Sequence, residues 1–312
     1  MQNYFNKLLF LLLIIPCLID AQVQLTESNY RIYSVKEGKV IALEDIARDM
    51  SNYDVLFLGE EHNDSVTHFI EHKLFELMYA KFNSNLALSL EMFDRDVQNV
   101  VNEYLQGYIR EKNFIKDSRA WSNYRDYKKL VEFAKDKKLN LVCANAPSRY
   151  TNLAGRKGQK ALMALSKESK KYFAPLPYDT ASGDYYNKLM DLTHGNPVST
   201  NDTSKVKVNM MPMGQFNLVM AQSLWDATMA YSIKEQLKKY PKKKILQING
   251  KFHSDEGFGI VTQLKKYKPK VKILIITSTS DDAFPDIDWS KYKNIGDYIL
   301  VTDPNVPRTY KE

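Results

Sequence analysis

The stretch VLFLGEEHND, residues 55–64, joins an unbroken apolar run directly to a cluster of charged and polar side chains. Successive apolar residues without alternation are typical of a strand buried on both faces, as in a parallel sheet between two layers of helices. We expect five further strands of this character, and the last of them at an edge of the sheet: residues 86–90, 140–144, 244–248, 271–277 and 298–301.

Helical periodicity separates most of these predicted strands. The helical segments cover residues 66–80, 97–107, 124–137, 215–239 and 257–267. Strands that alternate with helices are typical of parallel sheets covered on both faces. The sequence therefore predicts an α/β fold, with a mostly parallel central sheet flanked by helices.

Residues 156–213 depart from this alternation. They are richer in Lys, Ser, Asn, Thr and Pro than the predicted strands and helices around them. We interpret this part as a helical insertion, or lid subdomain, over one end of the sheet. Within it, residues 197–207 have the composition of a mobile loop.

The N-terminus has the pattern of an export signal. A short apolar run at residues 8–15 follows Lys7, too short to span a bilayer as a helix but of the right length for a signal-peptide core. Ala21 marks the expected cleavage point, so residues 1–21 are predicted to be a signal peptide. Lipidation of Cys17 is the less favoured alternative, because Pro16 replaces the small residue that such sites prefer. We expect an exported protein, periplasmic or associated with the cell envelope.

The composition of residues 22–312 limits the possible partners. Cys143 is the one cysteine left after cleavage, so no disulfide can form within the chain. The length is enough to bury a core without one. The net charge of +7 is scattered over many lysines, and together with export this argues against nucleic acid as a partner.

Polar side chains follow four of the predicted strands. Glu60 and His62 follow the first strand, Glu91 the second, Arg149 the third and His253 the fourth. Ligands of open parallel sheets bind beyond the carboxyl ends of the strands. Two imidazoles and two carboxylates also match the ligand set of a divalent cation. Polar loops are common, but this explains one such segment better than four, so we expect a genuine site.

The helix predicted over residues 66–80 places two histidines on one face. His68 and His72 are four residues apart, and they share the face opposite the apolar positions with Phe75. The histidine pair taken alone favours a face exposed to solvent, and the alternative is cover by the lid, a second subunit or a flat ligand. Phe75 favours some form of cover.

Two further residues carry possible binding chemistry. Asp226 projects from the apolar face of the long predicted helix, where an unpaired carboxylate would be costly, so we expect a partner, either Arg149 or a site histidine. A buried structural salt bridge is the alternative interpretation. Tyr150 follows Arg149 in the third strand-end loop, and tyrosine can bind ferric haem as phenolate.

These segments, taken in order, resemble the ChaN-like haem-binding uptake family, a relative of the Tiki and TraB proteins. The resemblance runs from about residue 53 to residue 277 and rests on LGEEHND at 58–64 with His68, LEMFDR at 90–95, ANAPSR at 144–149, WDATMA at 225–230 and GKFH at 250–253. The chain departs from the family pattern where Ser148 is inserted before Arg149, and where Lys251 and Phe252 precede His253.

The resemblance implies an α/β core with a helical subdomain, haem binding linked to iron uptake, and haem held between two subunits. It thus predicts one ChaN-like domain over residues 22–312 and a homodimer. The residues that we assign to haem binding are His68, His72, Arg149, Tyr150 and Asp226, with Arg156, Lys157 and His62 as further candidates for propionate or iron.

The Tiki relationship implies an alternative, a metal-dependent hydrolase or protease. Gly59 to His62 fits the Gly-x-x-His motif of those relatives. His62, Glu91 and His253 would then hold a divalent metal such as zinc or manganese, and Glu60 would act as general base on the metal-bound water. A scaffold without any ligand is the third hypothesis.

Overall fold

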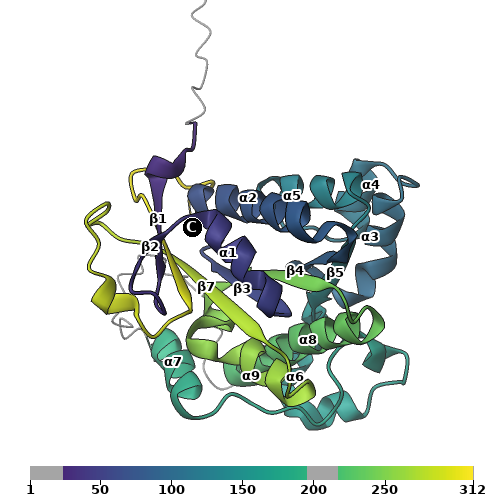
Figure 1. The fold of residues 1–312 in the computed structure, drawn as a ribbon. Helices are drawn as coiled ribbons and strands as arrows, with labels where there is room; N and C mark the ends of the chain where they lie inside the picture. The colour runs from purple at the N-terminus through teal and green to yellow at the C-terminus, as the bar shows by residue number, and fades with distance from the viewer. Residues whose placement is uncertain (1–23, 195–216, 312) are drawn as a thin grey trace, which may run out of the picture.

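The computed structural model describes residues 24–194 and 217–311, so the predicted signal peptide, Cys17 and the predicted loop at 197–207 lie outside the described residues. One eight-stranded sheet crosses the molecule in the order β2-β1-β8-β7-β3-β6-β4-β5 (Figure 1). Its strands are β1 Tyr30–Ser34, β2 Lys39–Ile41, β3 Val55–Glu60, β4 Leu86–Asp94, β5 Asn140–Asn145, β6 Lys244–Gly250, β7 Ile273–Ser280 and β8 Tyr298–Thr302.

The six strands predicted from apolar runs all form, and they pair in parallel, which confirms the predicted α/β class. The edge position expected for residues 298–301 is wrong. β8 pairs with β7 on one side and with the antiparallel β1 on the other. β1 and β2 extend the sheet beyond β8, and their short, partly exposed sequences carry no continuous apolar run.

Alternating residues of the parallel strands pack against two separate helical layers. Leu56 and Leu58 belong to the core cluster that also contains residues of the first five helices. Val55 and Phe57 belong to a second cluster with residues of α8 and α9. A strand buried on both faces needs apolar residues at every position, which explains the unbroken run at residues 55–58.

The two layers lie above and below the sheet in Figure 1. Above it lie α1 Leu43–Asp49, α2 Ser65–Phe82, α3 Gln98–Leu105, α4 Glu111–Asp117 and α5 Tyr124–Asp136, and below it α6 Ser148–Met163, α7 Gly183–His194, α8 Leu218–Lys239 and α9 Gly259–Tyr267.

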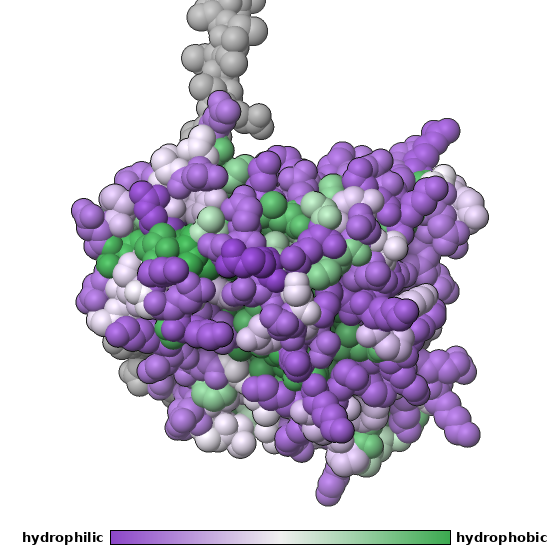
Figure 2. Space-filling model, viewed as in Figure 1, coloured by the Kyte–Doolittle hydropathy of each residue, from purple (hydrophilic) through white to green (hydrophobic). Residues whose placement is uncertain are grey.

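Hydrophilic residues cover most of the face seen in Figure 2, and apolar residues appear there in separate patches. In the described part of the chain, no helix combines the length and the apolar character that a membrane span requires.

The described part of the predicted insertion, residues 156–194, is largely helical and begins within α6. α6 starts at Ser148 and packs against α8 through a cluster that includes Tyr150, Leu162 and Phe173. Its described remainder runs through α7 to residue 194. The segment thus adds helices on the outer side of α8.

The face of α2 that carries the two histidines is covered, but not by the lid. α5 packs against α2, and Phe75 is fully buried with its ring 5.2 Å from that of Phe133. His68 is buried beside Tyr127, while His72 lies at the margin of the contact and retains partial exposure. Solvent exposure, which the histidine pair taken alone favours, is therefore wrong for His68; Phe75 indicates the cover but does not identify α5 as its source.

Candidate functional site

Three neighbouring strands bring the predicted polar loops to one edge of the sheet. β6 lies between β3 and β4, and the register places Glu60 beside Gly250. The Gly250 N–H donates to Glu91 Oε2 at 2.7 Å, which ties the end of β4 to the loop after β6. Because the carboxyl ends of parallel strands meet at this edge, residues far apart in sequence become direct neighbours.

His253 lies between two carboxylates. Its Nδ1–H donates to Asp226 Oδ1 at 2.6 Å, and its Nε2 lies 3.4 Å from Glu91 Oε1. The Tyr185 hydroxyl donates to the other oxygen of Asp226 at 2.7 Å. Burial alone would lower the pKa of His253, but Glu91 and Asp226 raise it to about 10, so this buried imidazole is a cation at neutral pH. The partner predicted for Asp226 is therefore the site histidine and not Arg149.

His62 connects this group to a second one. Its Nδ1–H donates to Glu60 Oε1 at 2.8 Å, and about a third of its side chain is exposed, at 32%. A methyl group on Gly250 would lie 2.9 Å from His62 Nε2, so only glycine leaves room for the ring there. Burial opposes the charged form of His62, yet Glu60 and Glu91 together raise the pKa of its imidazole.

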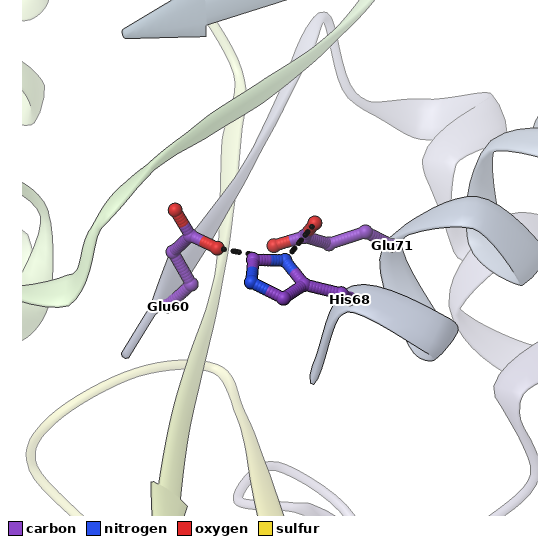
Figure 3. Close-up of side chains that lie close together, drawn as sticks. All are labelled: Glu60, His68 and Glu71. Carbon is purple, nitrogen blue, oxygen red and sulfur yellow. Dashed lines mark hydrogen bonds and ion pairs between the residues drawn. The ribbon is translucent and has the colours of Figure 1, made fainter. Parts of the chain in front are cut away.

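The second group lies beneath His62 and is buried. Glu60 and Glu71 both face Nδ1 of His68, with Oε2 of Glu60 at 3.3 Å and Oε2 of Glu71 at 3.1 Å (Figure 3). The ring's Nε2–H donates to the backbone carbonyl of His62 at 3.1 Å. The Tyr127 hydroxyl donates to Glu60 Oε1 at 2.7 Å.

The charges of this second group are strongly perturbed. Burial opposes ionisation of Glu60, but His62 and His68 lower its pKa to about 2. Burial also opposes the charge of His68, but Glu71, Glu60 and Asp126 raise its pKa to about 10. Burial and the neighbouring Glu60 raise the pKa of Glu71 well above its usual range. Within this group, the surroundings thus favour the ionised form of Glu60, the neutral form of Glu71 and the cationic form of His68.

A hollow opens beside His62. It has a volume of about 580 Å³ and is lined by Trp121, Ser122, Asn123, Arg125 and Tyr310, and we call it the rim hollow. The Trp121 ring meets the His62 ring edge-on, with centroids 5.2 Å apart. The Asn123 amide donates to the carbonyl of His62. The rim hollow is thus bordered by two residues, Trp121 and Asn123, that contact His62.

The C-terminal tail forms one wall of the rim hollow. The Thr309 N–H donates to the Asn63 carbonyl at 2.9 Å, and the Arg125 guanidinium donates to the Thr309 carbonyl. Arg308 forms ion pairs with Glu61 at 2.9 Å and with Asp64 at 3.1 Å. These contacts hold Tyr310 against the loop that carries His62.

The structure brings together six of the residues singled out from the sequence and leaves three elsewhere. Glu60, His62, Glu91, Asp226 and His253 form one connected chain of contacts, and His68 joins it through Glu60. The other three have separate partners: Arg149 pairs with Asp96 at 2.6 Å, Tyr150 packs on Phe173 within the α6 cluster, and His72 lies beside Glu76 and Phe133.

The described residues offer one group of three or more side chains with metal-ligand spacing. It consists of Glu60, His68 and Glu71, whose donor atoms lie within 4.8 Å of one another. The predicted metal set of His62, Glu91 and His253 does not form such a group in the described part of the chain. Its members are joined instead by hydrogen bonds and ion pairs to neighbouring carboxylates.

Several residues of the site were not predicted from the sequence. Glu71 lies three residues after His68 on the same helix, a spacing that places both on one face and could have identified it. Tyr127, Tyr185, Trp121 and Tyr310 reach the site from distant segments. No local pattern distinguishes these four from the other aromatic residues of the chain.

Comparison with known proteins places the chain in a family. Residues 46–264 match the family described as haem-binding uptake, Tiki superfamily, ChaN. This match covers well over half of the sequence. The chain belongs to the ChaN family. The resemblance inferred from the ordered motifs is thereby confirmed, and haem is the ligand after which the family is described.

The stronger of two matches to solved structures agrees with this assignment at the level of the fold. One, described as cofacial heme binding to ChaN of Campylobacter jejuni, matches with a TM-score of 0.62 at 17% identity, over 88% of this chain and 98% of that chain. Another, of the type III effector HopBA1, matches with a TM-score of 0.45 at 9% identity, over 84% of this chain and 94% of that chain. Comparison with curated proteins gave no match.

Proposed function

We propose that this ChaN-family protein binds haem in the rim hollow, at the carboxyl end of its sheet, and serves haem or iron uptake. Family membership supports haem as the ligand. The observation that carries the proposed position is the rim hollow itself, an aromatic-lined space whose Trp121 ring meets the His62 ring edge-on. Pockets of about 300–1,000 Å³ are the usual size for small-molecule and cofactor sites.

The residues of the rim hollow fit what haem requires of a protein. A porphyrin needs apolar or aromatic surface, and Trp121 and Tyr310 supply it. Its propionates need a cation, and Arg125 is 71% exposed at the hollow. Its iron takes histidine or tyrosinate ligands, and His62 and Tyr310 are the candidates at this place. When bound, the haem would supply a redox-active iron.

The polar site beneath the hollow would orient His62. Glu60 accepts the Nδ1–H of His62, and this fixes the tautomer and tilt of the ring. His68 holds the backbone of the same residue through its carbonyl. His68 and Asp226 therefore enter the proposal as positioning residues, because their polar atoms already contact protein partners. Arg149, Tyr150 and His72 do not line the hollow.

We further propose export and dimerisation. The apolar run at residues 8–15 supports a signal peptide, with the mature protein in the periplasm or cell envelope. The similar structure from Campylobacter jejuni is described as binding heme cofacially. A second copy facing the rim hollow would allow the same arrangement here and would cover the open side of the ligand.

Hemin titration of haem-free protein, residues 22–312, tests this proposal. We expect a saturable Soret shift, and a weaker one for Arg125→Gln because a propionate loses its cation. Arg149→Gln is the matched control, because it removes an arginine that pairs with Asp96 away from the hollow. A titration that shows only the linear signal of free hemin would refute haem binding. Sedimentation of the loaded protein tests the dimer, and a monomer at saturation would refute it.

A further inference from the structure

The buried group of Glu60, His68 and Glu71 has a feature that haem binding does not use. The backbone carbonyl of His62 accepts a hydrogen bond from His68 Nε2, so Nε2 carries a proton in both the cationic and the neutral form of the ring. The other ring nitrogen, Nδ1, faces the carboxyl groups of Glu60 and Glu71, and a metal ion bound there would displace the Nδ1 proton. Three acceptors that face one another require a positive charge between them, from protons or from a metal ion.

The spacing of the three groups fits a metal ion. First-row metals bind nitrogen and oxygen ligands at about 2.0–2.2 Å, which separates adjacent ligand atoms by about 2.8–3.6 Å in tetrahedral or octahedral sites. His68 Nδ1 lies 3.3 Å from Glu60 Oε2 and 3.1 Å from Glu71 Oε2. His68 Nδ1 therefore already lies at this separation from both carboxylates, and all three donors lie within 4.8 Å of one another.

Two buried oxygens of the group make no hydrogen bond, and the first of them has only the ion pair with His68 at 3.3 Å. They are Glu60 Oε2 and Glu71 Oε1, and both glutamates are almost completely buried, with exposed fractions of 1% and 0%. A buried carboxylate oxygen without a partner is costly and is rare in folded proteins. Figure 3 shows the two carboxyl groups on opposite sides of the His68 ring, directed toward its nitrogen edge.

The surroundings already provide the second layer of contacts that metal ligands usually have. Histidine ligands commonly donate their second N–H to a backbone carbonyl, as His68 does to His62. Carboxylate ligands commonly accept hydrogen bonds at their other oxygen, as Glu60 does from Tyr127 and His62. These contacts hold the ligand atoms in place whether or not an ion is bound.

We propose that Glu60, His68 and Glu71 form a buried site for one divalent transition-metal ion, such as Zn²⁺ or Mn²⁺. One imidazole and two carboxylates suit these ions, and two carboxylates balance the charge of a divalent ion. The site is separate from the set of His62, Glu91 and His253 considered from the sequence. It also stands independently of haem binding, since none of its three ligands lines the rim hollow.

The test uses haem-free protein of residues 22–312, with Zn²⁺ and Mn²⁺ added separately. We expect one equivalent to remain after dialysis, as measured by elemental analysis, and Glu71→Gln to lose at least nine-tenths of it. Glu76→Gln is the matched control, because Glu76 lies beside His72 on the same helix but is partly exposed. Full retention in this control is part of the prediction.

Wild-type protein that retains neither metal overturns the proposal, and so does Glu71→Gln with unchanged stoichiometry. Because Glu71→Gln could fail to fold, anomalous diffraction from zinc-loaded wild-type crystals gives a second measurement. The anomalous peak is expected within bonding distance of Glu60, His68 and Glu71. A peak elsewhere, or none, contradicts the assignment. Failure of hemin binding would leave this result unaffected, so the two proposals can fail separately.

Discussion

Replacing Asp226 with asparagine tests the electrostatic design of the site. Asp226 is 1% exposed, accepts the Nδ1–H of His253 at 2.6 Å and accepts the Tyr185 hydroxyl at 2.7 Å. Asparagine keeps the shape and an acceptor oxygen but removes the negative charge. The imidazolium of His253 then retains Glu91 alone as its buried counter-ion, at 3.4 Å.

The expected loss of unfolding free energy in Asp226→Asn follows from the burial of the ion pair between Asp226 and His253. Removing one partner of a buried ion pair costs about 3–5 kcal/mol, and we expect about 3 kcal/mol because His253 can release its proton in the variant. At roughly 2 °C per kcal/mol for a domain of this size, the melting temperature falls by about 6 °C. Glu235→Gln on the same helix is the control, because its ion pair with Lys234 is partly exposed and contributes at most about 1 kcal/mol.

The loss of unfolding free energy in Asp226→Asn should also depend on pH. The folded-state pKa of His253 is raised from 6.5 to about 10, so its stabilising contribution is complete below pH 6.5 and disappears as the pH rises through about 10. Urea denaturation of wild type and D226N at pH 6.5 and near pH 10 should show a difference in unfolding free energy that shrinks with rising pH. A difference no larger than that of Glu235→Gln, or one that grows with pH, would refute this reasoning.

Two further changes probe the same site by urea denaturation. Tyr127→Phe removes the hydrogen bond to the Glu60 carboxylate at 2.7 Å, and we expect a loss of about 1.5–3 kcal/mol; an unchanged midpoint would show that this bond contributes nothing. Gly250→Ala places a methyl group 2.9 Å from His62 Nε2, so the ring must move and stability should fall by about 1–3 kcal/mol. Wild-type stability in Gly250→Ala would mean that the ring is not confined there.

The sheet could be predicted because its parallel strands are buried on both faces. Each of these strands is an apolar run, which is a purely local signal. β1 and β2 lack it, since β1 alternates polar and apolar residues and β2 is largely exposed. Their pairing depends on the neighbouring β8, and this is why the edge position of β8 was predicted wrongly.

The polar site could be predicted in part for the same reason. Parallel strands end at a common edge, so Glu60, Glu91 and His253 were expected near one another before any contact was known. Glu71 and Tyr127 contact Glu60 and its neighbours only because α5 packs on α2 at a particular rotation. That rotation is set by packing between distant segments, and a single sequence does not encode it locally.

The dissociation constant of hemin for Trp121→Ala tests most directly whether haem lies in the rim hollow. Trp289→Ala is the matched control, because Trp289 is also half-buried but stacks on Tyr33 in another part of the structure. Loss of the aromatic contact should weaken binding about tenfold, corresponding to about 1.4 kcal/mol. We predict this loss for Trp121→Ala and wild-type affinity for Trp289→Ala. Equal affinities in both variants would contradict the proposed position of the haem.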